Sequence, residues 1–383
     1  MSAVRVKTVI MAHPARAEAA RTLQKALPEL APEIIFDPQP DGPPTTLRTA
    51  RLAWRATDPQ ATHHLVLTDD VLPSPAFARQ LGEAVAARPH DPLSFFCMWS
   101  TRNSFAFRLA ALHGATWVQN VSSYVPCQAL AVPVGLAGEI ADFLEHEAVI
   151  GKGSVSYHDN EDDMSVHKCL RRLGVQALLS VPSLVDHPRR ASLLGHPAEQ
   201  PTVALMGDDD PPPDWFAPPY RPGCVPHVHY NTVRAMCDRY DDETARWVST
   251  STEQYFSGRG VYVSDLVGWV VAATGSDPDL DAVVRRIGLG PVYQLWITAC
   301  ALGRVFADEV APRDGLRELQ AALERPAAAH ALATMTGGAL HQVLWPDELA
   351  AVTPTLDAMV IEAVRRGALL RPQVGPAPVA AGR

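Results

Sequence analysis

The sequence contains no run of apolar residues as long as the ~20 needed to span a membrane. It also lacks a basic start followed by an apolar core, so we expect no secretory signal and take the cytoplasm as the default location. There is no run of Lys and Arg, and the formal net charge is −9. Because binding to phosphates needs clustered positive charge, this acidic balance argues against nucleic acid as a partner.

Cysteine is scarce, and its pattern indicates no metal or redox motif. The six cysteines include no C-x-x-C pair, and in a reducing compartment such thiols are mostly small buried side chains. The spacing of Cys224, His227, His229 and Cys237 matches no common zinc pattern. What is present is a chain of 383 residues, 47% hydrophobic, which at roughly 150 residues per domain suggests two domains with their own cores.

The first 200 residues alternate strand and helix patterns. Apolar runs rich in β-branched residues predict strands at Val4–Ala12, Glu33–Phe36, His64–Thr68, Leu93–Trp99, Ala129–Val134 and Leu178–His187. Helical spacing of apolar residues falls between them, at Arg16–Leu27, Leu47–Ala56, Phe77–Arg88 and Met164–Leu173. This order predicts an α/β domain over residues 1–200, with a mostly parallel sheet and helices on both faces.

The second half has a different composition. The proline-rich stretch 201–226 predicts a linker, because proline is excluded from helix interiors and central strands. Residues 227–371 are expected to form an all-α domain that docks an acceptor or mediates self-association as a homo-oligomer, and residues 372–383 a frayed tail. The predicted helices are His229–Val248, Ser264–Thr274, Leu280–Ile287, Val292–Val305, Leu316–Leu323, Ala327–Thr334 and Asp347–Arg366.

In a parallel sheet, ligands bind beyond the carboxyl ends of the strands, and Asp69-Asp70 follow such an end. Two adjacent carboxylates there repel each other and lose solvation unless a cation compensates them. Mg²⁺ or Mn²⁺ is the obvious cation, because both prefer oxygen ligands and often bind substrate phosphates as well. The alternative is a solvated turn in which both aspartates cap the backbone before Pro73. Arg48 and Trp54, on the next helix upstream, are candidates to border a nucleotide.

Two further segments carry polar groups. The acids Glu161, Asp162 and Asp163 open a predicted helix, where they are either ordinary first-turn acids or hold a general base. The preceding loop Gly151–Ser156 is of a kind that closes over ligands. His187 ends a predicted strand; it is either a surface residue or a metal ligand, and the second interpretation requires it to approach Asp70 in space.

The order of these segments is that of a known family. A strand-terminal Asp-Asp, a later Glu-Asp at a helix start and a histidine after the next strand resemble the GT-A nucleotide-sugar glycosyltransferases, over about residues 4–196. The phrase Val181–His187, followed by Ser192–His196, is similar to the end of the catalytic domain in bacterial and phage members. Thr68 stands where the usual Asp-x-Asp motif of the family has its first acid.

The resemblance implies a role for each segment. By it, Asp70 and His187 would bind Mn²⁺ or Mg²⁺ against the donor diphosphate, and Asp162, flanked by Glu161 and Asp163, would be the base that activates the acceptor. The nucleotide-binding residues that it implies are His13, Pro14, Arg16, Asp37 and Asp69.

We therefore expect a metal-dependent glycosyltransferase that moves a sugar from a nucleotide donor, with UDP the expected nucleotide, to an acceptor hydroxyl. A metal would absorb the charge that develops on the leaving phosphate, and a carboxylate would remove the acceptor proton. If Asp162 does so, a single displacement inverts the sugar. The alternatives are a nucleotidyltransferase with the same metal site, although His13–Arg16 lacks the glycines and lysine of a triphosphate loop, and a non-catalytic binding or scaffold protein.

Overall fold

The computed structural model describes residues 4–150, 161–187, 193, 201–229, 232–310 and 315–370. Within these, the chain divides into two compact units. Unit 1 comprises Met1–Met98 and Ala115–Arg221, and unit 2 comprises Trp99–Gly114 and Pro222–Arg383. The chain leaves unit 1 for the last time after Arg221, inside the stretch 201–226 where we expected the domain boundary. That Trp99–Gly114 belongs to unit 2 was not predicted.

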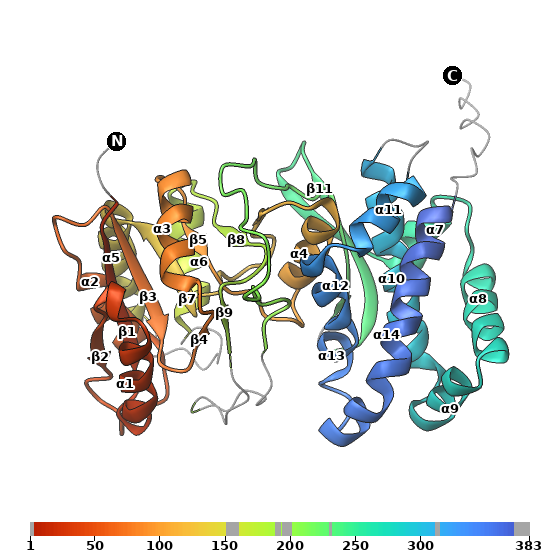
Figure 1. The fold of residues 1–383 in the computed structure, drawn as a ribbon, viewed down its shortest axis with the longest axis horizontal. Coiled ribbons are helices and arrows are strands. Elements are labelled where there is room, and N and C mark those ends of the chain that lie inside the picture. Colours follow the sequence, from red (N-terminus) through yellow and green to blue (C-terminus); the bar gives the residue numbers. More distant parts are fainter. Residues whose placement is uncertain are drawn as a thin grey trace. The chain divides into compact units, whose positions relative to one another are not determined.

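Unit 1 is built on a seven-stranded sheet with strand order β2-β1-β3-β7-β5-β8-β6 (Figure 1). Its strands are β1 (Val6–Ala12), β2 (Glu33–Phe36), β3 (His63–Thr68), β5 (Leu93–Ser94), β6 (Trp117–Gln119), β7 (Ala129–Pro133) and β8 (Leu178–Ser180). Strand β1 runs parallel to β2 and β3, and β5 runs parallel to β8. The other pairings are antiparallel. The predicted α/β class is confirmed; the sheet is mixed, with the expected parallel order in its first three strands.

Helices cover both faces of this sheet, as predicted (Figure 1). On one face, α1 (Ala17–Ala26) and α3 (Phe77–Ala87) belong to a core that includes Ile10 and Ala12 of β1. On the other, α2 (Leu47–Arg55), α5 (Val134–Ile150) and α6 (Asp162–Arg172) belong to a core that includes Val9 and Met11. Because successive side chains of a strand point to opposite faces, a strand covered on both sides is apolar where it is covered, as β1 is over Val9–Ala12.

Three parts of unit 1 differ from the expected pattern. The run Leu93–Trp99 contains only the two-residue strand β5, and Leu178–His187 is broken into β8 and β9 (Val185–Asp186). Strand β9 pairs with β4 (Leu72–Pro73) in a separate antiparallel ladder. The proline-rich stretch packs within unit 1 up to residue 221 instead of forming a free linker: Trp215 is 3% exposed, and its indole Nε1 donates to Gln80 Oε1 at 2.7 Å.

Unit 2 is largely helical, but it is not all-α. Its helices are α4 (Arg102–His113), α7 (Thr252–Ser257), α8 (Val263–Ser276), α9 (Pro278–Ile287), α10 (Leu289–Glu309), α11 (Gly315–Leu323), α12 (Pro326–Ala333), α13 (Met335–Leu340) and α14 (Pro346–Leu369). They accompany an antiparallel sheet of β10 (Cys224–His229), β11 (Arg234–Asp241) and β12 (Arg246–Ser251). The prediction of a helix over His229–Val248 is therefore wrong.

The hairpin between β11 and β12 explains this error. Val233, Met236, Cys237 and Tyr240 are spaced as on one face of a helix, so the apolar pattern favoured a helix. A tight turn between strands usually has Gly, Asn or Asp at the position with positive φ. Here Ala245 occupies that position, with φ of 52°, so the sequence does not mark the turn.

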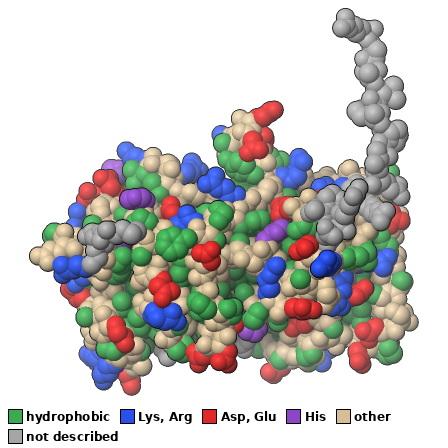
Figure 2. Space-filling model, turned by 45° about the horizontal axis from the view of Figure 1, so that its top comes forward, with side chains coloured by type: hydrophobic (Ala, Val, Ile, Leu, Met, Phe, Trp, Pro, Cys, Tyr) green, Lys and Arg blue, Asp and Glu red, His purple; other side chains and the backbone are tan. Residues whose placement is uncertain are grey.

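The surface is mixed in charge. On the face drawn in Figure 2, Lys and Arg side chains are interspersed with Asp and Glu, and no broad basic patch is visible. None of the helices in the described ranges combines the length and the apolar character that crossing a membrane requires.

In unit 2, two glycines allow α10 and α14 to pack closely. A Cβ added at Gly303 would overlap the backbone carbonyl of Val364, and one added at Gly367 would overlap the carbonyl of Cys300. The obstacle is backbone in both places, so neither contact can be relieved by turning a side chain. These glycines are therefore required by helix packing.

We expect Gly303→Ala to lower the free energy of unfolding by at least about 2 kcal/mol, because the added methyl group forces the two helices apart. Gly268→Ala on α8 is the control: a Cβ there meets nothing within 4 Å, and alanine in a helix stabilises by roughly 0.5–1 kcal/mol relative to glycine. Urea denaturation of both variants measures the difference. Equal midpoints for Gly303→Ala and the wild type would contradict the packing argument.

Candidate active site

Two buried carboxylates follow β3, and an arginine from the neighbouring parallel strand lies between them. Asp69 and Asp70 are 6% and 8% exposed. Arg16, in the single-turn helix η1 (Pro14–Arg16) after β1, donates to Asp69 Oδ1 at 3.3 Å and forms an ion pair with Asp70 Oδ2. The backbone N–H of His13 donates to Asp69 Oδ2 at 2.9 Å. The compensating cation that two adjacent acids require is thus supplied by the chain itself.

The histidine after β9 reaches the same carboxylate. His187 Nε2 lies 3.2 Å from Asp70 Oδ2. The β4–β9 ladder brings them together, because Leu72, two residues after Asp70, pairs with Asp186, the residue before His187. The carboxylate of Asp186 fixes this end of the strand by accepting the backbone N–H groups of His187 and Thr202, each at 2.8 Å. The proximity that the metal-ligand interpretation of His187 requires is therefore present.

The two acids are electrostatically unequal. Burial alone would raise the pKa of Asp70, but the hydrogen bond from His187 and the charges of His187 and Arg16 outweigh it and lower the pKa to about 2. Burial raises the pKa of Asp69, and the charge of Asp70 adds to this effect against the opposing N–H of His13 and charge of Arg16. Asp70 is consequently the firmly ionised member of the pair.

Asp37, after β2, lies at the same edge of the sheet but is engaged by its own loop. Its two carboxylate oxygens accept Arg48 Nε at 3.1 Å and Arg48 Nη2 at 3.0 Å, and Oδ1 also accepts the N–H of Gln39 at 3.0 Å. Burial raises the pKa of Asp37, yet the hydrogen bonds from Arg48 and Gln39 and the charge of Arg48 together outweigh it and leave the pKa lowered. Both residues therefore hold the loop that follows β2.

His13 belongs to the same arrangement. Its Nδ1 accepts the N–H of Ala15 at 3.1 Å, and its Nε2 lies 3.4 Å from the carbonyl oxygen of Pro40. Pro14 is exposed at the start of η1. Trp54 is fully buried against His64 in the core, so it is not available to border a ligand.

The acids at the start of α6 are held at this edge of the sheet by contacts with Thr46 and Val125. Glu161 is the N-cap residue of α6. The N–H of Asp162, itself 7% exposed, donates to Thr46 Oγ1 at 2.8 Å, and the carbonyl of Asp163 accepts the N–H of Val125 at 3.3 Å. Val125 shortly precedes β7, whose first residue pairs beside the end of β3. The start of α6 thus lies at the carboxyl edge of β3.

These acids form a second cluster, separate from the first cluster, which consists of Arg16, Asp69, Asp70 and His187. The described hydrogen bonds of Asp162 and Asp163 lead to Thr46, Val125 and Met164, and none leads to Asp69 or Asp70. Burial raises the pKa of Asp162, and burial together with the neighbouring acids raises that of Asp163 well above its usual range. A raised pKa suits a carboxylate that accepts a proton. The loop Gly151–Ser156 and His196 lie outside the described residues.

The first cluster suits a divalent cation that arrives together with a phosphate. In the described part of the chain, no group of three or more His, Cys, Asp and Glu side chains is arranged to hold a metal ion. Asp70 Oδ2 and His187 Nε2, at 3.2 Å, are nevertheless as close as two ligands that share one Mg²⁺ or Mn²⁺ ion, since ligands about 2.1 Å from an ion lie about 3 Å apart at right angles. Magnesium is commonly held by one or two side chains, with substrate phosphates and water completing the shell.

Two contributors to the site were missed from the sequence. Arg16 was assigned to the nucleotide and not to the acids, although the β1–β3 register pairs Met11 with Thr68 and so places the residues after each strand side by side. Thr46, at the start of α2, carries no sequence signal of its contact with Asp162, because α6 lies more than a hundred residues further along the chain.

Comparisons with known proteins add no family to this picture. No protein-family model matches the chain, and no curated protein matches its sequence. The geometry of the site is therefore what bears on function.

We expect Asp70→Asn to lower the free energy of unfolding at pH 7 by roughly 2 kcal/mol, because the folded pKa of Asp70, about 2, lies below its ordinary value of 3.8. A carboxyl with a lowered pKa contributes stability above pH 4, and this contribution is lost as the pH falls toward 2. Urea denaturation should show the same difference in the free energy of unfolding between variant and wild type at pH 7 and pH 5, and a smaller difference at pH 3.

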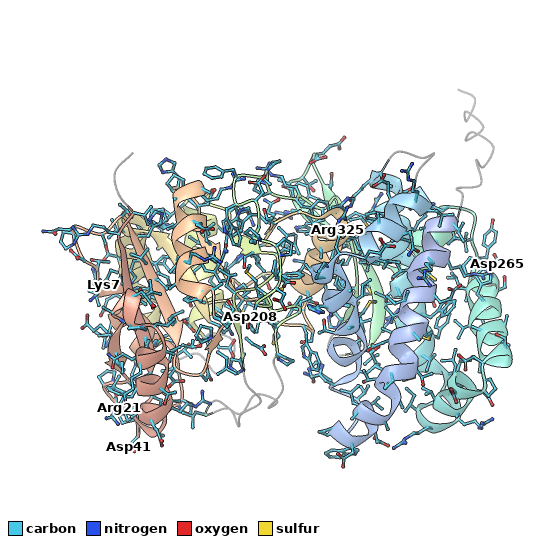
Figure 3. All side chains as sticks on the ribbon, in the orientation of Figure 1. Lys7, Arg21, Asp41, Asp208, Asp265 and Arg325 are labelled. Atoms are coloured by element: carbon cyan, nitrogen blue, oxygen red, sulfur yellow. The ribbon has the colours of Figure 1, made fainter. Side chains whose placement is uncertain are left out.

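Asp41→Asn is the matched control, because Asp41 is exposed in the loop after β2 (Figure 3). It should match the wild type at every pH. A cost of Asp70→Asn that stays constant down to pH 3 would contradict the assignment of a lowered pKa.

Proposed function

We propose that unit 1 is a metal-dependent glycosyltransferase domain, which transfers a sugar from a nucleoside diphosphate donor, with UDP as the nucleotide, to an acceptor hydroxyl. One observation carries the proposal. Asp70 and His187, from distant parts of the chain, converge to 3.2 Å at the carboxyl edge of the sheet, next to Arg16 and Asp69. This edge is where α/β folds bind their ligands.

The residues of the first cluster would hold the donor. Asp70 and His187 would bind Mn²⁺ or Mg²⁺, which when present neutralises the charge that develops on the leaving diphosphate. Arg16 and Asp69 lie beside them, at the position for the phosphates. The loop held by Asp37 and Arg48, with His13 against it, would receive the nucleoside.

The second cluster would supply the base. In the proposed step, the acceptor oxygen forms a bond to the anomeric carbon while the bond from that carbon to the donor phosphate breaks. The acceptor proton passes to Asp162, and the electron pair of the broken bond leaves with the diphosphate. Such a single displacement inverts the anomeric centre. The raised pKa of Asp162 favours proton uptake.

The two other candidate functions have less support. As caps, Asp69 and Asp70 would bond to nearby backbone, but their side chains reach His13 and Arg16 after β1 and His187 after β9. This weakens the scaffold interpretation. A nucleotidyltransferase would need a loop for a triphosphate, and η1 contains neither glycine nor lysine.

Calorimetric titration with UDP in the presence of Mn²⁺ tests donor binding. We expect the wild type to bind, and Asp70→Ala and His187→Ala each to weaken UDP binding at least about tenfold, since each removes a ligand of the shared ion. Asp279→Ala, at an exposed aspartate of α9 in unit 2, is the control and should bind like the wild type. Absence of heat with the wild type, or unchanged binding by Asp70→Ala, would refute the proposal.

Asp162→Asn tests the base separately from donor binding. The amide keeps the size of the side chain but cannot take up a proton, so we expect UDP affinity within about twofold of the wild type and turnover reduced at least about a hundredfold. Release of UDP from a panel of UDP-sugars measures turnover, with Asp279→Asn, at an exposed aspartate of α9, as the control. Retained turnover would show that Asp162 is not the base.

A further inference from the structure

The charges of the first cluster do not suit a diphosphate as they stand. Asp69 and Asp70 contribute two acidic groups, and Arg16 places one permanent positive charge against both. A nucleoside diphosphate is a polyanion, and an acid pair with one arginine offers it no net attraction. A divalent cation on the acids, added to the charge of Arg16, would reverse the sign of the site.

Arg16 and an incoming cation would meet on the same atom. Asp70 Oδ2 is the oxygen that Arg16 contacts, and it is also the oxygen that lies 3.2 Å from His187 Nε2. An ion shared by Asp70 and His187 would therefore bind where the guanidinium now lies. Two cations on one carboxylate oxygen repel each other, so the ion competes with the bond between Arg16 and Asp70.

Arg16 can keep its contact with Asp69 when an ion occupies Asp70. Its second contact, with Asp69 Oδ1 at 3.3 Å, does not involve the shared oxygen. Both contacts are made by Nη1, and a guanidinium, with five N–H donors in a planar fork, is a group that binds phosphate oxygens in pairs. Its side chain is 18% exposed, which leaves part of it open to a ligand.

We infer that Arg16 is a resident cation that competes with the divalent ion for Asp70 and, once displaced by it, becomes a ligand of the donor diphosphate. Metal and donor would then bind in order: the ion weakly on its own, because it must compete with Arg16, and the diphosphate tightly afterwards, because Arg16, no longer held by Asp70, can turn to it. The diphosphate half of this inference rests on the proposed function, whereas the competition for Asp70 does not.

Titration of the full-length protein with Mn²⁺ alone tests the competition. We expect Arg16→Gln to bind Mn²⁺ at least about tenfold more tightly than the wild type, the scale of losing one charge-assisted hydrogen bond. UDP binding at saturating Mn²⁺ should change in the opposite direction, weakening about tenfold. Arg21→Gln is the matched control, because Arg21 is an exposed arginine on α1 and its replacement removes the same charge (Figure 3). It should match the wild type in both titrations.

Arg16→Lys guards against a folding defect, since Arg16→Gln leaves two buried acids with less compensation. Lysine keeps the charge but replaces the planar guanidinium, whose Nη1 contacts both carboxylates, with an ammonium on a different stem. Mn²⁺ should therefore bind with an affinity between those of the wild type and Arg16→Gln. Thermal unfolding identifies which variants are folded. Mn²⁺ affinity that is unchanged or weaker in a folded Arg16 variant overturns the inference.

The two titrations separate this inference from the proposed function. If Arg16→Gln binds Mn²⁺ more tightly but neither it nor the wild type binds UDP, the competition holds and the glycosyltransferase proposal fails. If the wild type binds UDP with Mn²⁺ and the Arg16 variants bind both ligands as the wild type does, the proposed function stands and the inference fails.

Discussion

Two adjacent carboxylates at the end of a buried strand are the constraint on which this site depends. In a medium of low dielectric constant, both cannot be ionised without a cation close by. Here Arg16 approaches from the β1 side and His187 from the β9 side, and the result is unequal: the pKa of Asp70 is lowered while that of Asp69 is raised. Asp70 is thereby the more acidic of the two, and its Oδ2 is the oxygen that both partners contact.

Backbone pairing brings these groups together, and it leaves little freedom. The parallel register of β1 with β3 aligns the ends of the two strands, so the residues after Ala12 lie beside Asp69. The ladder of β4 with β9 has only two pairs, yet it fixes His187 against Asp70. A slip of one residue in either pairing would turn the side chains to the opposite face and separate the groups. The irregular segments around β4 and β9 are thus as important to the site as the central sheet.

The sequence was sufficient for the regular part of this arrangement. Apolar runs rich in β-branched residues predicted β1, β2 and β3, and the abrupt change to Asp69-Asp70 marked an end where ligands bind. It was insufficient for contacts that depend on tertiary structure. A two-residue strand such as β4 has no periodicity to detect, and the β11–β12 hairpin was hidden by a turn with Ala245 at positive φ. Helix α4 belongs to unit 2 although it lies between segments of unit 1, which no local pattern reports.

Thr68, which stands where the Asp-x-Asp motif has its first acid, and Arg16 together set the charge of the site. An acid in place of Thr68 would add a third negative charge, and a divalent ion would then serve mainly to neutralise the protein. With threonine there, two acids face one arginine, so a divalent ion leaves the site positively charged. A positive site at the carboxyl edge of a sheet attracts a diphosphate, and a nearly neutral one does not. The positive charge that would attract the proposed donor therefore depends on both cations together, the divalent ion and Arg16.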